Sequence, residues 1–356
     1  MKTSQGIETI MIFDLFPLIL TTFCCALVMV KAVQPIAVEI GLVDRPCVRK
    51  KHDGHVPLIG GISTFVAVLV ATSIWLPDTQ ELRMYLIASA MLVFIGILDD
   101  KYDLSVRVRL VGQTLVACLM LFGVGTYISN FGNLLGFGTL EIGPLGLIFT
   151  FFAILVLINA FNMIDGLDGL LGGQSLNTLI SIAILFIIGN NYQDLNYPLI
   201  LVFALLPYLA FNLDIYKRFT RKIYMGDAGS MFIGLSVIWL LGKGTQGANP
   251  SFNPVTALWI TAVPLMDMLA IVIRRVRKGH PPFKADRDHL HHICIKAGLS
   301  QKKTLALITT MSLLMSAFGI LGHLLEFPEV LMLVLFLMIF VIYSRILSYI
   351  SSKQIA

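Results

Sequence analysis

The chain has 356 residues, of which 57% are hydrophobic and only 13% charged, with a mean hydropathy of +0.84. Soluble domains carry about 25% charged residues, so this composition excludes a soluble protein, a disordered chain and a coiled coil. The net charge of +5 does not indicate nucleic-acid binding, because the basic residues are sparse and lie between long apolar segments. The composition therefore predicts an integral membrane protein with many spans.

Eleven segments are apolar and long enough to be read as transmembrane helices, which need roughly 17–25 residues each. They lie near 12–31, 57–77, 83–98, 108–128, 144–163, 174–190, 197–213, 229–243, 254–273, 303–323 and 328–348. No linker or low-complexity stretch interrupts them. The sequence predicts an all-α fold with about eleven transmembrane helices, in one polytopic domain covering residues 1–356.

Lysine and arginine predict the orientation, because short cytoplasmic loops carry an excess of them. With the N-terminus outside, 23 of the 26 basic residues fall on the inner side, and only Lys2, Arg83 and Lys243 fall outside. An odd number of helices puts the two termini on opposite sides. We therefore expect a periplasmic N-terminus, a cytoplasmic C-terminus and the polar motifs described next on cytoplasmic loops.

An acidic cluster, DDKYD at 99–103, lies at the inner end of the third predicted helix. Adjacent carboxylates repel each other, and crowding them at a membrane face is costly unless they share a cation or a proton. Mg²⁺ suits such a place, because it binds carboxylates together with substrate phosphates. A solvated acidic loop is the alternative, and this cluster alone does not decide between the two.

Polar side chains recur every third residue at the inner end of the fifth predicted helix, at Asn159, Asn162, Asp165 and Asp168. Neighbours at this spacing lie on one helical surface. The glycines that follow favour a loop where the backbone can approach a ligand closely. A capped helix end is the alternative interpretation, but four such side chains at membrane depth are expensive, which favours a functional site.

The segment YMGDAGS, with Asp227 between glycines, opens the eighth predicted helix and follows four basic residues. Asp227 can cap this helix. The same geometry presents backbone N–H groups together with a carboxylate, which suits a metal-bound phosphate. The basic run is typical of a cytoplasmic face near lipid head groups.

Four of the seven histidines fall between residues 280 and 292, in the longest inner loop, where the sequence reads DRDHLHH. The HEXXH spacing of a zinc site is absent, and no cysteine pair accompanies the histidines. Histidine and arginine donors directed at phosphate oxygens are the better interpretation. A weaker basic signal, RKKHDGH at 49–55, precedes the second predicted helix on the same side.

Together these motifs suit phosphoryl transfer between a soluble donor and a lipid-dissolved acceptor. They also make the chain resemble, from end to end, the polyprenyl-phosphate N-acetylhexosamine-1-phosphate transferases. The motifs that carry the resemblance are RKKHDGHVPLIGG, LDDKYD, NAFNMIDGLDG, YMGDAGSMFIG and PFKADRDHLHH. The His-x-His-His spacing is similar to that of the branch using GlcNAc and departs from that of the muramyl-pentapeptide transferases.

The resemblance implies transfer of GlcNAc-1-phosphate from UDP-GlcNAc to undecaprenyl phosphate, with release of UMP. It implies dependence on Mg²⁺, with Mn²⁺ as a second usable ion, and a location in the bacterial cytoplasmic (inner) membrane. The product would start O-antigen, enterobacterial common antigen or teichoic-acid synthesis. A homodimer is retained as one option for the assembly.

The resemblance also implies roles for residues at matching positions. Asp227 and Asn162 would hold the metal, and Asp99, Asp100 and Asp168 would form the catalytic group, with Asp99 deprotonating the lipid phosphate. The expected substrate-binding residues are Lys51, Asn159, Asp165, Asn212, Arg287, His289, His291 and His292, with Asn212 on the uracil. Direct displacement and a covalent acyl-phosphate on an aspartate both remain open.

Two other functions remain open at this point. A relative that uses another UDP-N-acetylhexosamine would differ in only a few loop residues. A secondary transporter would place its acidic residues near the bilayer midplane, whereas here they gather at helix ends. Whether an aspartate is needed for binding alone or for turnover would separate a transporter from an enzyme.

Overall fold

The computed structural model describes residues 2–44, 54–125, 127–215, 221–279, 281 and 289–353, with side chains from residue 15 to residue 350. The helices are α1 (Lys2–Ile40), α2 (Gly60–Trp75), α3 (Gln80–Tyr102), α4 (Val106–Leu119), α5 (Leu145–Ile164), α6 (Leu170–Ile188), α7 (Tyr192–Asn212), α8 (Gly226–Thr245), α9 (Pro254–Ile260), α10 (Ala262–Arg277), α11 (Leu290–Lys296), α12 (Gln301–Leu324) and α13 (Glu329–Lys353). A π-helical turn, η1 (Met120–Val124), extends α4. Within these ranges, β1 (Val43–Asp44) and β2 (Val56–Pro57) form the only sheet, an antiparallel pair.

Helices occupy all eleven positions at which the sequence predicts a span, but they do not all qualify as spans. In the described part of the chain, nine helices are long and apolar enough to cross a membrane, or ten if one bent pair counts as a span. α2 is apolar but has only 16 residues. The all-α membrane class is confirmed, whereas the count of eleven is not.

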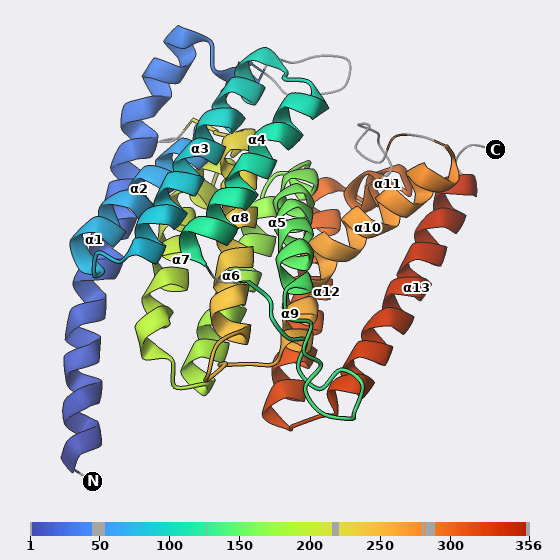
Figure 1. Cartoon of the computed structure of the whole chain (residues 1–356). Coiled ribbons are helices and arrows are strands. Elements are labelled where there is room, and N and C mark those ends of the chain that lie inside the picture. The colour runs from blue at the N-terminus through green and yellow to red at the C-terminus, as the bar shows by residue number, and fades with distance from the viewer. Residues whose placement is uncertain are drawn as a thin grey trace.

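The predicted span at 254–273 is the clearest departure from the sequence-based expectation. Instead of one straight helix, α9 and α10 meet at Thr261 with a bend of 81°. Pro264 gives the physical reason, because it has no N–H to donate to the carbonyl of Ile260, four residues earlier. α10 therefore leaves the direction of α9 and crosses the upper part of the bundle (Figure 1).

α8 is the central helix and carries the YMGDAGS motif into its first turn. Nearly all of it is buried, and it packs against α2, α3, α5 and α6. Glycines allow the closest approaches: a Cβ at Gly61 would lie 2.2 Å from the Gly229 nitrogen, and one at Gly96 would lie 2.2 Å from the Ala228 Cα. Small residues let helix backbones touch inside membranes, so these glycines bring three motifs together.

The segment between β2 and α2 is joined to the lead-in of α8 by backbone hydrogen bonds. Leu58 forms a parallel bridge with Tyr224. The N–H groups of Gly60 and Gly61 donate to the carbonyls of Tyr224 and Met225 at 2.9 and 3.0 Å. These bonds hold the end of the RKKHDGHVPLIGG motif beside YMGDAGS, although the two motifs are far apart in the sequence.

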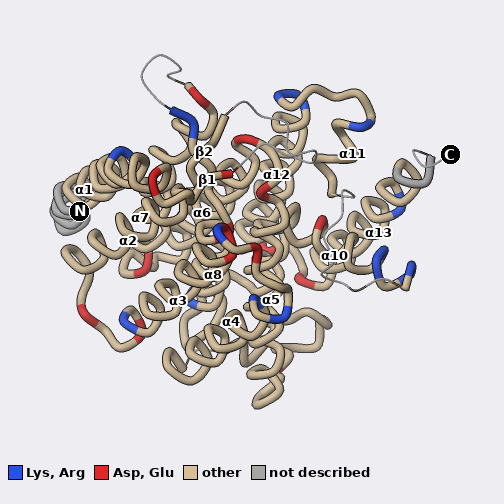
Figure 2. Tube along the Cα trace, turned by 90° about the horizontal axis from the view of Figure 1, so that it is seen from above, with Lys and Arg blue, Asp and Glu red and all other residues tan. Residues whose placement is uncertain are grey.

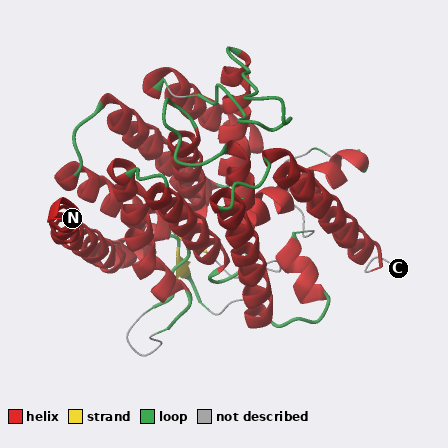
Figure 3. Ribbon diagram, turned by 90° about the horizontal axis from the view of Figure 1, so that it is seen from below, coloured by secondary structure: helices red, strands yellow, loops and turns green. Residues whose placement is uncertain are grey.

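The two ends of the bundle differ in what they carry. The C-terminal ends of α3 and α5, the first turn of α8, and α11 lie at the end drawn at the top of Figure 1, where α13 also ends; α1 begins at the bottom. Figure 2 looks down on this end and shows acidic and basic segments side by side near α8 and α5. Figure 3 looks onto the opposite end, where loops link neighbouring helices.

Candidate active site

The end of α3 places the two adjacent aspartates, 99 and 100, against the start of α8. Asp100 accepts hydrogen bonds from the backbone N–H groups of Asp227 and Ala228, at 2.8 and 3.3 Å. It thereby caps a helix start whose N–H groups have no partner inside the helix. Gly226 makes this possible, because its φ is +75° and a Cβ there would lie 2.4 Å from a carboxylate oxygen of Asp100. In this structure Asp100 holds the first turn of α8.

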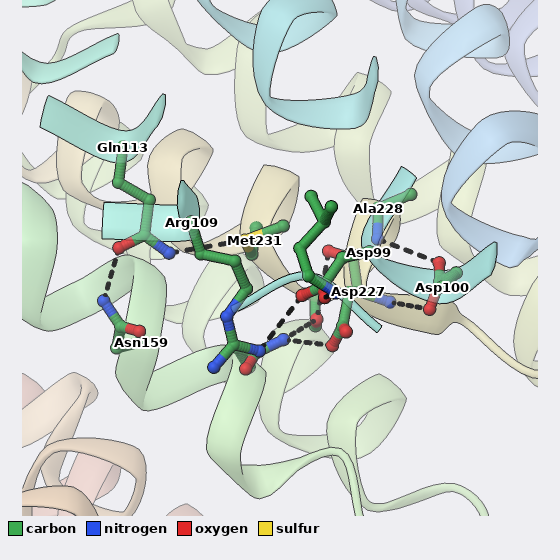
Figure 4. Close-up of polar contacts among 11 residues, drawn as sticks. Asp99, Asp100, Arg109, Gln113, Asn159, Asp227, Ala228 and Met231 are labelled. Atoms are coloured by element: carbon green, nitrogen blue, oxygen red, sulfur yellow. Dashed lines mark hydrogen bonds and ion pairs between the residues drawn. The ribbon is translucent and has the colours of Figure 1, made fainter. Parts of the chain in front are cut away.

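Asp99 is buried and faces the other way, toward α4. One carboxylate oxygen accepts from the N–H of Leu104 at 2.9 Å, and the other pairs with Arg109 Nη1 at 3.0 Å. Figure 4 shows Arg109 reaching from α4 toward Asp99 and Asp227, whose carboxylates are close enough to interact electrostatically. From the sequence, Arg109 counts only toward orientation, because nothing local shows that the turn after α3 brings it back to Asp99.

The two residues expected to hold the metal are in direct contact. Asn162, in the last turn of α5, donates through Nδ2 to Asp227 Oδ1 at 2.6 Å and to Ser230 Oγ at 2.9 Å. A half-turn of the amide would present its oxygen instead. Ser230 lies one helical turn after Asp227, and the sequence did not single it out.

The donor set fits Mg²⁺ better than a fully protein-ligated metal. In the described part of the chain, no three or more His, Cys, Asp or Glu side chains converge so as to hold a metal ion. Asp99, Asp227 and Asn162 together offer carboxylate and amide oxygens at one place. Mg²⁺ is usually bound through one or two carboxylates, with waters and substrate phosphates completing its octahedron.

A second acidic group lies on the loop between α5 and α6, beside the lead-in to α8. Asp168 forms an ion pair with Lys222 at 2.5 Å, and the same ammonium lies 5.1 Å from the centroid of the Tyr224 ring. Burial raises the pKa of the Tyr224 hydroxyl, and the carboxylates of Asp168, Asp44 and Asp165 raise it further. Lys222 and Asp44 therefore join a neighbourhood for which the sequence singled out only Asp165 and Asp168.

Two of the expected substrate contacts are occupied by the protein itself. Asn212 is buried, accepts from the Gly169 N–H at 2.7 Å and donates to the Ile223 carbonyl at 2.9 Å. Asn159 is also buried and donates to Gln113 at 2.7 Å (Figure 4). In this structure both amides position backbone and neighbouring helices, so their contact with substrate stays a prediction.

The histidines gather where α11 begins. The rings of His289 and His291 are nearly parallel, 5.7 Å apart, and those of His291 and His292 are 4.2 Å apart. Both ring nitrogens of His291 are buried and have no hydrogen-bond partner among the described residues. Burial, followed by the nearby His292 and His289, lowers the pKa of His291 to about 3. His291 is therefore neutral at pH 7.

The histidine cluster, His289, His291 and His292, rests on the loop that carries Asp165 and Asp168. A Cβ at Gly166 would lie 2.2 Å from Nε2 of His291, so only glycine permits this contact. The last of the five motifs is thereby joined to the third. The two remaining expected residues, Lys51 and Arg287, lie outside the described residues.

Comparisons with known proteins show the family to which this chain belongs. Residues 82–244 match the model of glycosyl transferase family 4. The undecaprenyl-phosphate α-N-acetylglucosaminyl 1-phosphate transferase of Yersinia pestis is 43% identical over 312 residues, which are 87% of this chain and 85% of that protein. The chain belongs to the polyprenyl-phosphate N-acetylhexosamine-1-phosphate transferases.

Other members of this transferase family match over similar lengths. The protein of the same name from Haemophilus influenzae is 44% identical over 328 residues, 91% of this chain and 92% of its own length. That from Escherichia coli K12 is 42% identical over 312 residues, 87% of this chain and 85% of its own length. With its apolar helices, the transferase is a multi-pass protein of the bacterial inner membrane.

Proposed function

We propose that this transferase moves GlcNAc-1-phosphate from UDP-GlcNAc to undecaprenyl phosphate, giving undecaprenyl-diphosphate-GlcNAc and UMP. The observation that carries the proposal is the meeting of Asp99, Asp227, Asn162 and Arg109 at one end of a membrane-spanning bundle. The names of relatives more than 40% identical support the acceptor and the transferred sugar.

In the proposed reaction an oxygen of undecaprenyl phosphate forms a bond to the phosphorus that carries GlcNAc. The bond from that phosphorus to the oxygen bridging to UMP breaks, and UMP leaves with the electron pair. Asp99 would take the proton from an acceptor phosphate that is still protonated, a role that requires a carboxylate within hydrogen-bond reach. Arg109, which already holds Asp99 at 3.0 Å, would keep this carboxylate oriented and bring positive charge toward the phosphates.

We propose that Asp227 holds Mg²⁺, or Mn²⁺ in its place, together with the amide oxygen of Asn162. When bound, the ion supplies positive charge to phosphate oxygens and neutralises charge that develops during transfer. Asp100 would contribute by keeping the first turn of α8, and with it Asp227, in place. The facing carboxylates of Asp99 and Asp227 support a cation here, because like charges this close repel one another until one arrives.

The nucleotide and sugar would lie toward the second acidic group and the histidine cluster. Lys222, paired with Asp168, is a described cation at this place, and Lys51 and Arg287 are further cations expected from the sequence. Cations and histidine donors suit the oxygens of a diphosphate. Asp165 and Asp168 would accept hydrogen bonds from hydroxyl or ring N–H groups of UDP-GlcNAc.

We also propose that this end of the bundle faces the cytoplasm, with the N-terminus in the periplasm and the C-terminus in the cytoplasm. The support is the distribution of basic residues, which leaves Lys243 and Arg83 near the opposite end. The product would be the first lipid-linked intermediate of O-antigen, enterobacterial common antigen or teichoic-acid synthesis. Another UDP-N-acetylhexosamine remains the alternative donor, and a homodimer one option for the assembly.

The test is a transfer assay on the purified protein in detergent. Radiolabelled UDP-GlcNAc, undecaprenyl phosphate and Mg²⁺ are mixed, and label moving into the organic phase is counted together with released UMP. Transfer that depends on both lipid and Mg²⁺ is the expected result. Folded protein that transfers label only from another UDP-sugar would overturn the donor assignment, and folded protein that transfers label from none of these sugars would overturn the reaction.

A further inference from the structure

A buried carboxylate outside the groups described above contacts the histidine cluster. Asp267 lies in α10 and is only 2% exposed. One of its oxygens, Oδ2, lies 3.0 Å from His289 Nδ1. The other, Oδ1, accepts from the N–H of Leu290 at 3.0 Å and from the hydroxyl of Tyr343 at 3.1 Å.

These contacts decide which nitrogen of His289 carries the proton. An ionised carboxylate only accepts hydrogen bonds, so the ring must donate to it through Nδ1–H. Nε2 is then the one ring nitrogen left for the substrate. It accepts a hydrogen bond when the ring is neutral and donates to a phosphate oxygen when the ring takes up a second proton.

His289 is linked through His291 to the loop that carries the second acidic group. His289 packs nearly parallel to His291, and His291 lies against Gly166 on the loop with Asp165 and Asp168. A change in the ring of His289 therefore reaches the side where we place the sugar nucleotide. The group formed by Asp99, Asp100 and Asp227 has no direct contact with Asp267.

We propose that Asp267 is a positioning residue, which holds His289 as its Nδ1–H tautomer and so orients the histidine cluster toward UDP-GlcNAc. This inference rests on the proposed function for the identity of the substrate. The competing explanation is a purely structural role, because Asp267 also ties α10 to α11 and to α13.

Asp267→Asn separates these explanations, because the two oxygens of Asp267 have different partners. The asparagine oxygen can stay at the Oδ1 position, where Leu290 and Tyr343 both donate. Its NH₂ group then replaces Oδ2 and presents a donor to Nδ1, which moves the proton of His289 to Nε2. The shape and two of the three hydrogen bonds are kept, while the tautomer is reversed.

We expect Asp267→Asn to lower kcat/KM for UDP-GlcNAc about 100-fold. Losses of this order follow in other enzymes when the residue that orients a metal-binding or catalytic histidine is replaced. The KM for undecaprenyl phosphate should change less than about twofold. Tyr343→Phe is the matched control, because it removes one hydrogen bond from the same carboxylate and keeps the histidine contact; about threefold or less is expected. In a His289→Gln background, Asp267→Asn should add little further loss.

The direct readout is the tautomer itself, measured from the imidazole ¹⁵N shifts of His289, with His289→Gln identifying the signal. The wild type should be protonated at Nδ1, and Asp267→Asn at Nε2. Three results would each overturn the proposal: a KM that rises equally for UDP-GlcNAc and undecaprenyl phosphate, kinetic constants that do not change, or a His289 tautomer that does not change. Absence of transfer by the wild type would instead overturn the proposed function, and the nitrogen shifts would still test the tautomer assignment.

Discussion

The two ends of α8 carry charged clusters that are satisfied in different ways. At its last turn, Lys243 lies 3.0 Å from carboxylate oxygens of both Glu81 and Asp194. Trp239 also donates to Glu81, at 3.1 Å. At the first turn, Asp227 has an amide partner in Asn162 but makes no ion pair among the described residues.

The two clusters differ in whether the chain itself supplies a cation for every carboxylate. The far-end cluster binds both of its carboxylates with a cation from the chain itself, so it joins α3, α7 and α8 without a ligand. At the motif end, Arg109 pairs with Asp99 while Asp227 stays beside it. Like charges left facing each other cost stability and favour a cation. We expect the far-end cluster to stabilise the fold and, under the proposed function, the motif-end cluster to serve substrate and metal.

The largest expected effect comes from Asp227→Asn. We expect turnover to fall at least ~10³-fold, because the substitution removes the charge that would hold the metal. The melting temperature in detergent should stay the same or rise, because a repulsion with Asp99 is lost. The transfer assay and a thermal scan on the same preparation measure both, with Ser230→Ala as a milder change beside it. Near-normal turnover would mean that Asp227 is not the metal ligand.

The next largest effect should come from the opposite end, as a loss of stability alone. Lys243→Met leaves two largely buried carboxylates without their cation, which we expect to cost about 3 kcal/mol. Turnover per folded molecule should change less than about twofold. Arg83→Met is the control, because its pair with Asp78 is more than half exposed and should contribute less than ~0.5 kcal/mol. Equal effects of the two substitutions would remove the distinction between the clusters.

Acidification should loosen the motif end through His291. The pKa of His291 is about 3 in the folded protein, below the ordinary 6.5. A state in which this ring is exposed to water therefore binds a proton more readily than the folded state does. The stability contributed by burying the neutral ring is therefore present above about pH 6.5 and lost progressively toward pH 3. About 2 kcal/mol should be lost between pH 7.5 and pH 5.

Melting temperature or proteolysis near α11, followed against pH, measures this loss. His291→Gln removes the titrating ring and should flatten the profile. The same slope in the wild type and His291→Gln would show that another group titrates.

The smallest expected effect is that of Lys222→Gln. Loss of the partner of Asp168 should lower kcat/KM for UDP-GlcNAc about tenfold, an effect typical of one charge-assisted contact. Stability should hardly change, because both side chains are about a third exposed. Arg221→Gln, at the exposed neighbouring position, should be close to wild type. A stability loss like that of Lys243→Met would make this pair a second structural cluster.

Much of the fold could be predicted from local properties of the sequence. Apolar segments of sufficient length are a property of consecutive residues, and helices do occupy the eleven predicted positions. Each motif is also a run of consecutive residues, and the comparisons confirm the family that the motifs indicated. The contact between Asn162 and Asp227 agrees with the expectation that they form one site, and their role toward the metal stays a prediction.

Three features of the site could not be predicted in this way. Arg109 reaches Asp99 only because a turn follows α3. Asp267 reaches His289 only because α10 bends away from α9 at Thr261. Asn212, expected on the substrate, uses both ends of its amide on Gly169 and Ile223. Each depends on where separate helices end relative to one another.

By itself, the sequence determined the membrane class, the positions of the helices and the family, because hydropathy and motifs are written in consecutive residues. Only the tertiary structure decided which carboxylates cap a helix, which pair with a cation and which face each other. The physical reason is close packing: where Gly61 and Gly96 let α2 and α3 touch the start of α8, residues distant in sequence come within hydrogen-bond reach.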